Sequence, residues 1–232
     1  INRIVTDRLS DFLFVSEPSG LANLKAEGVS DEKVFYTGNI MIDSLVSNLE
    51  VANKSDILKR LGFKRKEYIA MTMHRPANVD NPDILKSIIG AVQKISKRMP
   101  VVFPCHPRTQ NRLEEFGLSQ TSEGAGLRII EPLGYLDFLK LQTESRLVLT
   151  DSGGIQEETT YLQIPCVTMR ENTERPATVD IGTNVIVGTD PDKIAETALN
   201  AIKGKGKKGT VPELWDGKTA GRIVDILLDQ LP

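Results

Sequence analysis

From residue 68 onward, short apolar runs alternate with segments of helical spacing. Six runs are predicted to be strands, at residues 68–72, 101–104, 127–130, 147–150, 166–169 and 184–187. Strands that alternate with helices are typical of a parallel sheet, because each parallel connection needs a crossover long enough to hold a helix. The sequence therefore predicts an α/β fold with a doubly wound parallel sheet and helices on both of its faces.

The best-marked helix of this region begins after Asn81, a residue type that caps helices, with Pro82 at the first helical position. Its apolar residues recur at helical spacing and predict one buried stripe, made of Ile84, Leu85, Ile88, Ile89, Val92 and Ile95. Residues 203–209, which alternate lysine with glycine, are predicted to form a solvated loop without function.

The N-terminal part of the chain has a different pattern. A helix is indicated over the first nine residues, followed by strands at 12–15 and 34–37 with a helix from Pro18 to near Gly28 between them. Residues 39–61 follow helix spacing and lead out of this first region. We therefore expect three parts: residues 1–38, a helical linker at 39–66, and a C-terminal domain at 67–232.

The most informative segment is residues 150–158, Thr-Asp-Ser-Gly-Gly-Ile-Gln-Glu-Glu, which follows the apolar run 147–149. The pattern indicates a strand, a tight turn and a helix N-terminus. Gly153 and Gly154 would let a ligand approach the backbone, and Ser152 could cap the helix or bind an oxygen. The free N–H groups at the positive end of a helix suit a diphosphate, and Glu158 could accept hydrogen bonds from a vicinal diol such as a ribose. The alternative is a purely structural turn.

A second charged loop follows the apolar run 166–169 and contains Arg170 and Arg175. Ligands of parallel sheets collect at the carboxyl ends of the strands, so this loop and the glycine turn should face one crevice. A guanidinium group from either arginine could then bind a phosphate through two parallel hydrogen bonds.

Composition narrows the functional classes. The 232 residues are 40% hydrophobic and have a net charge of only −2, so nothing favours nucleic acid or an acidic membrane as a partner. Two cysteines and two histidines are too few for a disulfide framework and do not favour a zinc site, and we expect no metal and no cofactor. Cysteine usage favours the cytoplasm, and no apolar run approaches the roughly 20 residues that span a bilayer.

The segments 150–158 and 170–176 together resemble the non-hydrolysing UDP-N-acetylglucosamine 2-epimerases, a family with the two-domain GT-B fold of many glycosyltransferases. The resemblance extends from Asn2 and Arg3, through His74-Arg75 and residues 105–107, to Thr183 and residues 187–190. It implies that residues 67–232 are a GT-B-like Rossmann domain that binds UDP. It also implies that residues 1–38 are the last βα elements of a preceding nucleotide-sugar domain, so that the chain is a fragment.

The resemblance also implies roles for individual residues. His74, a structural histidine by default, matches an active-site histidine of the family, and Phe138, a core residue by its spacing, matches an aromatic that stacks on uracil. Arg75 and His106 match residues that help bind a second, activating UDP-N-acetylglucosamine. One position departs from the family pattern, since Ala77 stands where its members often carry glutamate.

Cys105 precedes His106 directly, which suggests a catalytic cysteine–histidine pair as one interpretation. Neighbours in an extended segment point to opposite faces, which prevents a hydrogen bond between them, and the pair is not expected to act as a nucleophile.

By resemblance, the expected activity is the interconversion of UDP-N-acetylglucosamine and UDP-N-acetylmannosamine for cell-surface polysaccharide, catalysed by a cytoplasmic homodimer. The implied mechanism is elimination and re-addition of UDP. Two alternatives remain, namely a UDP-sugar-dependent glycosyltransferase of the same fold and a nucleotide-sugar-binding module without activity.

Overall fold

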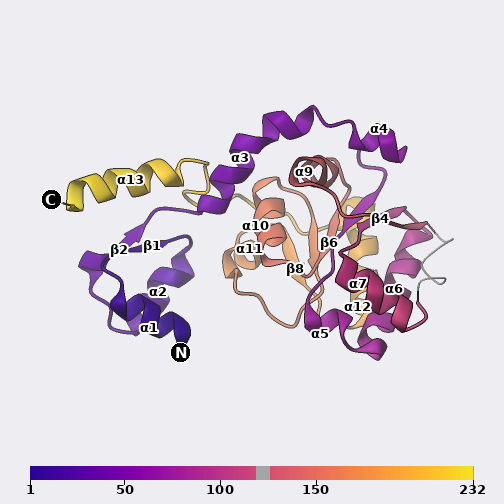
Figure 1. Cartoon of the computed structure of the whole chain (residues 1–232), viewed down its shortest axis with the longest axis horizontal. Helices are drawn as coiled ribbons and strands as arrows, with labels where there is room; N and C mark the ends of the chain where they lie inside the picture. The colour runs from indigo at the N-terminus through magenta and orange to yellow at the C-terminus, as the bar shows by residue number, and fades with distance from the viewer. Residues whose placement is uncertain (119–125, 232) are drawn as a thin grey trace. The chain divides into compact units, whose positions relative to one another are not determined.

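The computed structural model describes residues 1–118 and 126–231, and the chain forms two compact units (Figure 1). The first unit contains residues 1–47 and 211–232, and the second contains residues 48–210. The sequence analysis expects domain boundaries after residues 38 and 66, with residues 67–232 in one domain. The compact units differ from that expectation chiefly in the last 22 residues, which group with the beginning of the chain.

The first unit is built around two short parallel strands, β1 (Leu13–Val15) and β2 (Val34–Tyr36). Its helical elements are α1 (Asn2–Leu9), α2 (Pro18–Ala26), η1 (Asp31–Lys33), the first part of α3 (Ile40–Asn53) and α13 (Thr219–Gln230). The strands and the α2 helix match the sequence expectation, and Leu13, Val15 and Leu24 form a small core. The helical spacing of the first residues is also confirmed, although the apolar side chains of α1 are exposed.

Specific contacts explain why the C-terminal segment belongs to this unit. The Asp43 carboxylate accepts hydrogen bonds from the backbone N–H groups of Thr219 (3.1 Å) and Ala220 (2.7 Å) and so caps α13. The buried Trp215 donates through Nε1 to the carbonyl oxygen of Ser16 at 2.8 Å. The residues of these pairs are 176 and 199 positions apart in the sequence, so no local sequence pattern could predict the contacts.

The second unit contains a six-stranded, entirely parallel sheet in the order β5-β4-β3-β6-β7-β8. The strands are β3 (Ile69–Met71), β4 (Val101–Pro104), β5 (Leu127–Ile130), β6 (Val148–Thr150), β7 (Cys166–Thr168) and β8 (Asn184–Ile186). All six lie where the sequence predicts them. Numbered from β3, this is the 3-2-1-4-5-6 order of the Rossmann fold, in which the direction of winding changes between the first and fourth strands.

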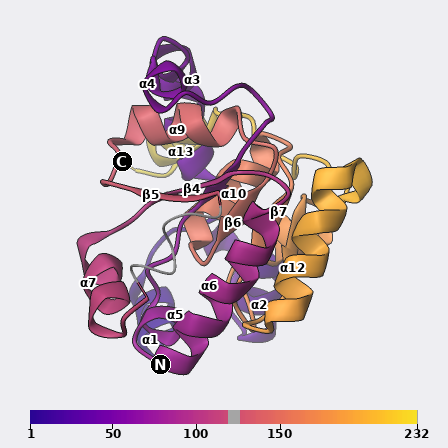
Figure 2. The same cartoon turned by 90° about the vertical axis from the view of Figure 1, so that its right-hand side faces the viewer.

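Helices cover both faces of the sheet, as expected for a doubly wound fold. They are α4 (Ile57–Leu61), α5 (Pro76–Val79), α6 (Pro82–Ser96), α7 (Pro107–Glu115), α9 (Tyr135–Thr143), α10 (Gly153–Tyr161), α11 (Pro176–Asp180) and α12 (Pro191–Asn200). Side chains of α6 and α12 pack with Ile69 and Met71 on one face, and Figure 2 shows these two helices side by side. Side chains of α4, α9 and α10 pack with Tyr68 and Ala70 on the other face. Because both faces are covered, the central strands are buried and mostly apolar, whereas the edge strand β5 carries the exposed Arg128.

The predicted start of α6 is confirmed in detail. The Asn81 side chain accepts hydrogen bonds from the backbone N–H groups of Asp83 (2.9 Å) and Ile84 (3.3 Å). The predicted stripe is buried, except that Ile84 is only partly buried at its edge.

Residues 39–61 are helical as expected, in two helices, α3 and α4, and the Ser55 hydroxyl between them accepts a hydrogen bond from the backbone N–H of Ile57 (3.2 Å). One local expectation was wrong. The lysine-glycine segment is not a fully solvated loop. It begins as a short π-helix, η2 (Ala201–Lys205), and the Lys207 ammonium is partly buried, where it donates to the carbonyl oxygens of Val179 and Asn184.

Candidate functional site

The candidate site lies at the carboxyl ends of β3 and β6, the two neighbouring strands between which the direction of winding changes. A crevice forms at such a point because the chain leaves the two strands toward opposite faces of the sheet. The hydroxyl groups of Thr72 and Thr150 bridge the two strand ends with a hydrogen bond of 2.8 Å. The segments that follow, 73–78 and 151–154, contain most of the polar groups of the site.

Asp151 organises this crevice and was not singled out in the sequence analysis. Its fully buried carboxylate accepts hydrogen bonds from the backbone N–H groups of His74 (3.0 Å) and Arg75 (2.8 Å). It also accepts one from the Asn78 side chain at 3.1 Å, and Asn78 donates in addition to the carbonyl oxygen of Met169 (2.9 Å). One carboxylate after β6 therefore shapes the loop that follows β3. In the sequence, the only indication of this role was the position of Asp151 between the predicted strand and the two glycines.

His74, a predicted catalytic residue, lies against this carboxylate. Its Nδ1 atom is 3.3 Å from Asp151 Oδ1, and its side chain is half exposed. The hydrogen bond to Asp151 raises the pKa of the His74 imidazole above its ordinary value, although partial burial and the charge of Arg75 oppose the increase. A histidine held in this way is cationic over a wider pH range and leaves Nε2 without a partner among the described residues.

A cavity of about 310 Å³ brings three predicted residues together. It is lined by His74, His106 and Phe138, and also by Thr72, Met73, Pro104, Pro132 and Leu133. Phe138 is half-buried and also packs against the sheet core, so its two predicted roles are compatible. A largely apolar wall with two imidazoles suits a flat ring that carries polar groups, since most ligand sites combine a hydrophobic lining with a few polar contacts.

His106 belongs to this cavity and not to a cysteine–histidine pair. Its Nδ1 accepts a hydrogen bond from the backbone N–H of Arg108 (3.2 Å) and caps α7. Cys105 is buried and only contacts the His106 carbonyl oxygen, and desolvation raises the pKa of its thiol to about 12. A thiol that stays protonated is a poor nucleophile, so the prediction of no Cys105–His106 dyad agrees with the structure.

The N-terminus of α10 presents the predicted anion site. No side chain caps this helix, and the Ser152 N–H donates to the Thr150 hydroxyl at 3.0 Å. A side-chain Cβ added at Gly153 or Gly154 would meet no atom within 4 Å, and neither glycine has a positive φ. The glycines are therefore not needed for a tight turn, and Ser152 does not cap the helix. What they leave is open space where side chains would stand on the first turn, next to N–H groups that have no partner inside the helix.

Glu158 lies one turn along α10 and is almost completely buried. Its carboxylate accepts hydrogen bonds from the Tyr135 hydroxyl (3.2 Å) and from Gln142 Nε2 (3.1 Å). Desolvation raises its pKa, opposed by these two donors. It does not line the cavity of His74 and Phe138, so the two groups occupy separate parts of the site.

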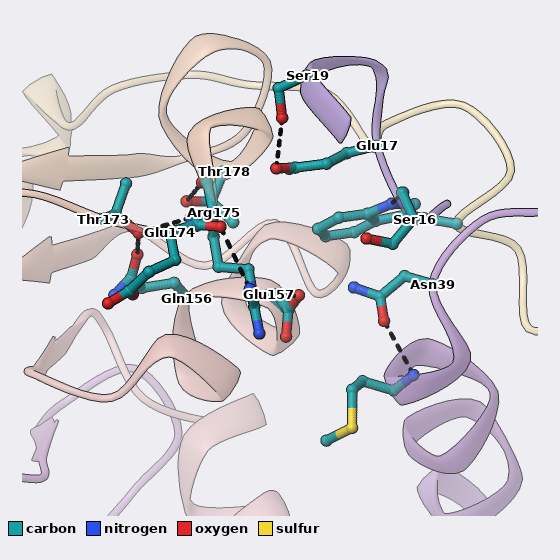
Figure 3. A network of polar contacts seen from close by, with 12 residues as sticks. Ser16, Glu17, Ser19, Asn39, Gln156, Glu157, Thr173, Glu174, Arg175 and Thr178 are labelled. Carbon is teal, nitrogen blue, oxygen red and sulfur yellow. Dashed lines mark hydrogen bonds and ion pairs between the residues drawn. The ribbon is translucent and has the colours of Figure 1, made fainter. Parts of the chain in front are cut away.

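Arg175 reaches α10 from the loop after β7. Its Nε lies 2.8 Å from Glu157 Oε1, and the guanidinium remains partly exposed (Figure 3). The same loop is tied to α10 by a hydrogen bond of 2.6 Å from the Thr173 hydroxyl to Gln156 Oε1. Arg170, the alternative phosphate ligand, is engaged by Glu174 through two hydrogen bonds of 2.9 and 2.6 Å. Of the two arginine side chains, that of Arg175 is the more exposed, at 42% against 13% for Arg170.

No group of three or more histidine, cysteine, aspartate or glutamate side chains is arranged to hold a metal ion within residues 1–118 and 126–231. Across the same residues, the helices are too short or too polar to cross a membrane.

Comparison with known proteins relates this geometry to a family. Residues 1–228 match the family described as UDP-N-acetylglucosamine 2-epimerase. A UDP-N-acetylglucosamine 2-epimerase of Methanococcus maripaludis is 40% identical over 235 residues, which cover 99% of this chain and 64% of that protein. A UDP-2,3-diacetamido-2,3-dideoxy-D-glucuronate 2-epimerase of Pseudomonas aeruginosa is 37% identical, with 98% and 62% covered.

Solved structures give the same relation. The crystal structure of Methanocaldococcus jannaschii UDP-GlcNAc 2-epimerase in complex with UDP-GlcNAc and UDP is 38% identical, with a TM-score of 0.87. The match covers 98% of this chain and 64% of that one, so the chain spans about two thirds of the length of these relatives. The chain matches these proteins in sequence along nearly its whole length, and it matches them in fold. It therefore belongs to the UDP-N-acetylglucosamine 2-epimerase family.

Proposed function

We propose that this chain is the nucleotide-binding part of an enzyme that interconverts UDP-N-acetylglucosamine and UDP-N-acetylmannosamine without hydrolysing them. The observation that carries the proposal is the meeting of two anion-stabilising groups at one crevice. One is His74, held by the buried Asp151 at 3.3 Å, and the other is the uncapped N-terminus of α10. Membership of the family supplies the chemistry to which this arrangement is suited.

The proposed reaction breaks and re-forms the bond between the sugar and the nucleotide. A base removes the proton from C2, a double bond forms between C1 and C2, and UDP departs with the electron pair of the C1–O bond. A diphosphate oxygen of UDP then returns to C1, while a proton is delivered to the opposite face of C2. UDP is both leaving group and nucleophile, so the site must stabilise its developing charge and also retain it.

The diphosphate would lie at the N-terminus of α10. The open space at Gly153 and Gly154 allows an oxygen to approach the first helical N–H groups, and the Ser152 hydroxyl adds a donor. Arg175 would contribute guanidinium N–H groups, with Nε already oriented by Glu157. His74 would donate from Nε2 to the developing charge, which its raised pKa favours.

The nucleoside would be recognised by two further groups. Each oxygen of the Glu158 carboxylate carries one hydrogen bond and retains a lone pair, which can accept from a ribose hydroxyl. Phe138 would stack on uracil from the wall of the cavity. Arg75 and His106 would contact a second, activating nucleotide sugar next to the first, with the contribution of the usual glutamate lost at Ala77.

The protein would act in the cytoplasm as a homodimer and supply UDP-N-acetylmannosamine to cell-surface polysaccharide. Two buried cysteines without a disulfide among the described residues fit a reducing compartment.

The test is to incubate the protein in its full natural length with UDP-N-acetylglucosamine and no acceptor, and to follow products by proton NMR. The proposal predicts formation of UDP-N-acetylmannosamine up to an equilibrium mixture. Consumption of donor only after an acceptor is added would favour a glycosyltransferase, and binding without turnover would favour a nucleotide-sugar-binding module.

A second candidate substrate follows from the Pseudomonas aeruginosa relative, which is named for a diacetamido-glucuronate nucleotide. A parallel incubation with that nucleotide separates the two substrates. We favour UDP-N-acetylglucosamine because relatives named for it have the higher identities.

A further inference from the structure

A further cavity in the second unit lies away from the candidate site, at the opposite edge of the sheet. It has a volume of about 480 Å³, and its lining includes Lys66, Arg146, Pro165 and Thr183. Each of these residues lies one to three positions before a strand of the parallel sheet. The cavity therefore opens at the amino ends of the strands, whereas nucleotide ligands of such sheets bind at the carboxyl ends.

Four cationic side chains line this cavity, and no carboxylate does. They are Lys66, Arg146, Lys207 and Lys208, joined by the polar Gln163 and Thr183. Lys66 Nζ donates to the carbonyl oxygens of Thr143 (3.0 Å) and Ser145 (2.8 Å), and Arg146 donates to that of Ile202 (2.7 Å). None of the four forms an ion pair of 4.0 Å or less with an acidic side chain within the described residues.

This arrangement leaves an uncompensated positive charge. Carbonyl dipoles orient a cation but do not neutralise it, and burial makes the remaining charge costly. Desolvation accordingly lowers the pKa values of Lys66 and Lys207, although Glu144 raises the first and Asp180 raises the second at longer range. Arg65 and Arg146 also lower the pKa of Lys66. An anion in the cavity would relieve this cost for Lys66 and Lys207 and would also attract Arg146 and the exposed Lys208.

The backbone around the cavity is unusual as well. Lys66 (φ 62°) and Gln163 (φ 55°) are two of the three non-glycine residues with positive φ in the described chain, and both line the cavity. Such conformations cost free energy and are often found where function requires them. The glycines at 204, 206 and 209 complete the lining and bring backbone close to the space.

We propose that the cavity at the amino edge of the sheet binds a small molecule carrying two or more phosphate charges, at a site separate from the nucleotide site. The number of cations matches an anion of several charges, and the volume exceeds what a single phosphate fills. Lysine and arginine, with glycine backbone alongside, are the groups that proteins use for phosphate.

Glycine amides provide separate reporters for the two edges of the sheet. In a nitrogen-15 correlation NMR spectrum, Gly204, Gly206 and Gly209 report on the cavity, and Gly153 and Gly154 report on the α10 site. Inorganic diphosphate is titrated into the chain already saturated with UDP. We expect the first three resonances to shift saturably, with sodium chloride at equal ionic strength producing no comparable shift.

Matched variants test the cations. Lys208 is exposed and makes no hydrogen bond within the described residues, so Lys208→Gln should keep the fold and weaken diphosphate binding about five-fold. Lys86→Gln removes an equal charge from an exposed position on α6 and should leave binding unchanged. Lys66→Gln should weaken binding further, with its fold checked from the dispersion of the same spectrum.

Three results would each overturn the proposal. They are cavity glycines that do not move while UDP is bound, shifts that sodium chloride reproduces, and equal diphosphate affinity in Lys208→Gln and Lys86→Gln. None of these results depends on epimerase activity, so the nucleotide site and this cavity are tested separately.

Discussion

Asp151 and His74 are joined twice, through the His74 backbone N–H at 3.0 Å and through Nδ1 at 3.3 Å from the carboxylate. The first contact fixes the course of the loop after β3, and the second fixes the imidazole within that loop. Since Asp151 begins the segment that leads into α10, the same residue places His74 relative to the proposed diphosphate site. Asp151 therefore holds the His74 side chain in place and also favours its protonated form.

Replacing Asp151 by asparagine should lower the pKa of His74, because the neutral amide no longer stabilises the imidazolium. The two histidines give two imidazole signals, so a proton NMR titration measures His74 with His106 as the internal control. The variant should also lose about 1–3 kcal/mol of stability, because donors that met a charged acceptor now meet a weaker one. An unchanged His74 pKa in the folded variant would show that Asp151 only shapes the loop.

The raised pKa of His74 also predicts how stability depends on pH. The folded-state pKa lies above the unfolded value of 6.5, so the stabilisation from the Asp151 contact is fully present below 6.5. It is lost as the pH rises through the folded-state pKa. Urea unfolding across this range should show the decrease in wild type and a flatter profile in His74→Gln. Because the imidazole is half exposed, solvent screening reduces the effect.

Glu158→Gln should weaken UDP binding by about 1.5–3 kcal/mol, the range for hydrogen bonds to a charged group. The substitution keeps the size of the side chain and the partners Tyr135 and Gln142, whereas alanine would leave both without an acceptor. Calorimetric titration at neutral pH measures the change, with Glu196→Gln on the exposed face of α12 as control. Equal UDP affinity in the two variants would remove Glu158 from the site.

Arg175→Lys should reduce the affinity for UDP even though the charge is kept. Lysine lacks the planar donor geometry by which Nε meets Glu157 while other N–H groups remain for a phosphate. Arg98→Lys, at an exposed position after α6, is the matched control. If both variants bind UDP as wild type does, Arg170 becomes the residue to test.

Gly154→Ala should separate folding from binding. The new methyl group meets no atom within 4 Å and alanine favours a helix, so stability should stay the same or increase by about 0.5–1 kcal/mol. UDP affinity should decrease, because the methyl group occupies the space in front of the helix N-terminus. Gly182→Ala is the contrasting variant, since its Cβ would lie 2.4 Å from the Thr160 hydroxyl oxygen and should destabilise the fold. Normal UDP binding by Gly154→Ala would place the diphosphate elsewhere.

The strands and the helix at Asn81 could be predicted because their signals are local. Apolar runs and a capping residue depend only on neighbours in the chain, and a sheet buried on both faces makes the runs conspicuous. The glycine segment was predicted as a site from its local pattern, whereas the site roles of His74 and Phe138 were predicted only from the family resemblance. Asp151 was missed because its importance lies in what it contacts across two strands. The hydrogen-bond partners of Glu158 and the contacts that hold residues 211–232 could not be predicted for the same reason, since each depends on residues distant in sequence.

The consecutive acids of α10 have a further consequence. Successive helical residues point about 100° apart, so Glu157 reaches Arg175 in one loop while Glu158 reaches Tyr135 and Gln142 of α9. The proposed site would thereby assign each acid to a different half of the nucleotide, Glu157 through Arg175 to the diphosphate and Glu158 to the nucleoside. The assignment depends on the helical phase counted from Gly154. A single residue inserted between Gly154 and Glu157 would turn both acids away from their partners without changing a residue that touches the ligand. The number of residues between Gly154 and Glu157 is therefore expected to matter for nucleotide recognition as much as the identity of the residues that contact the nucleotide.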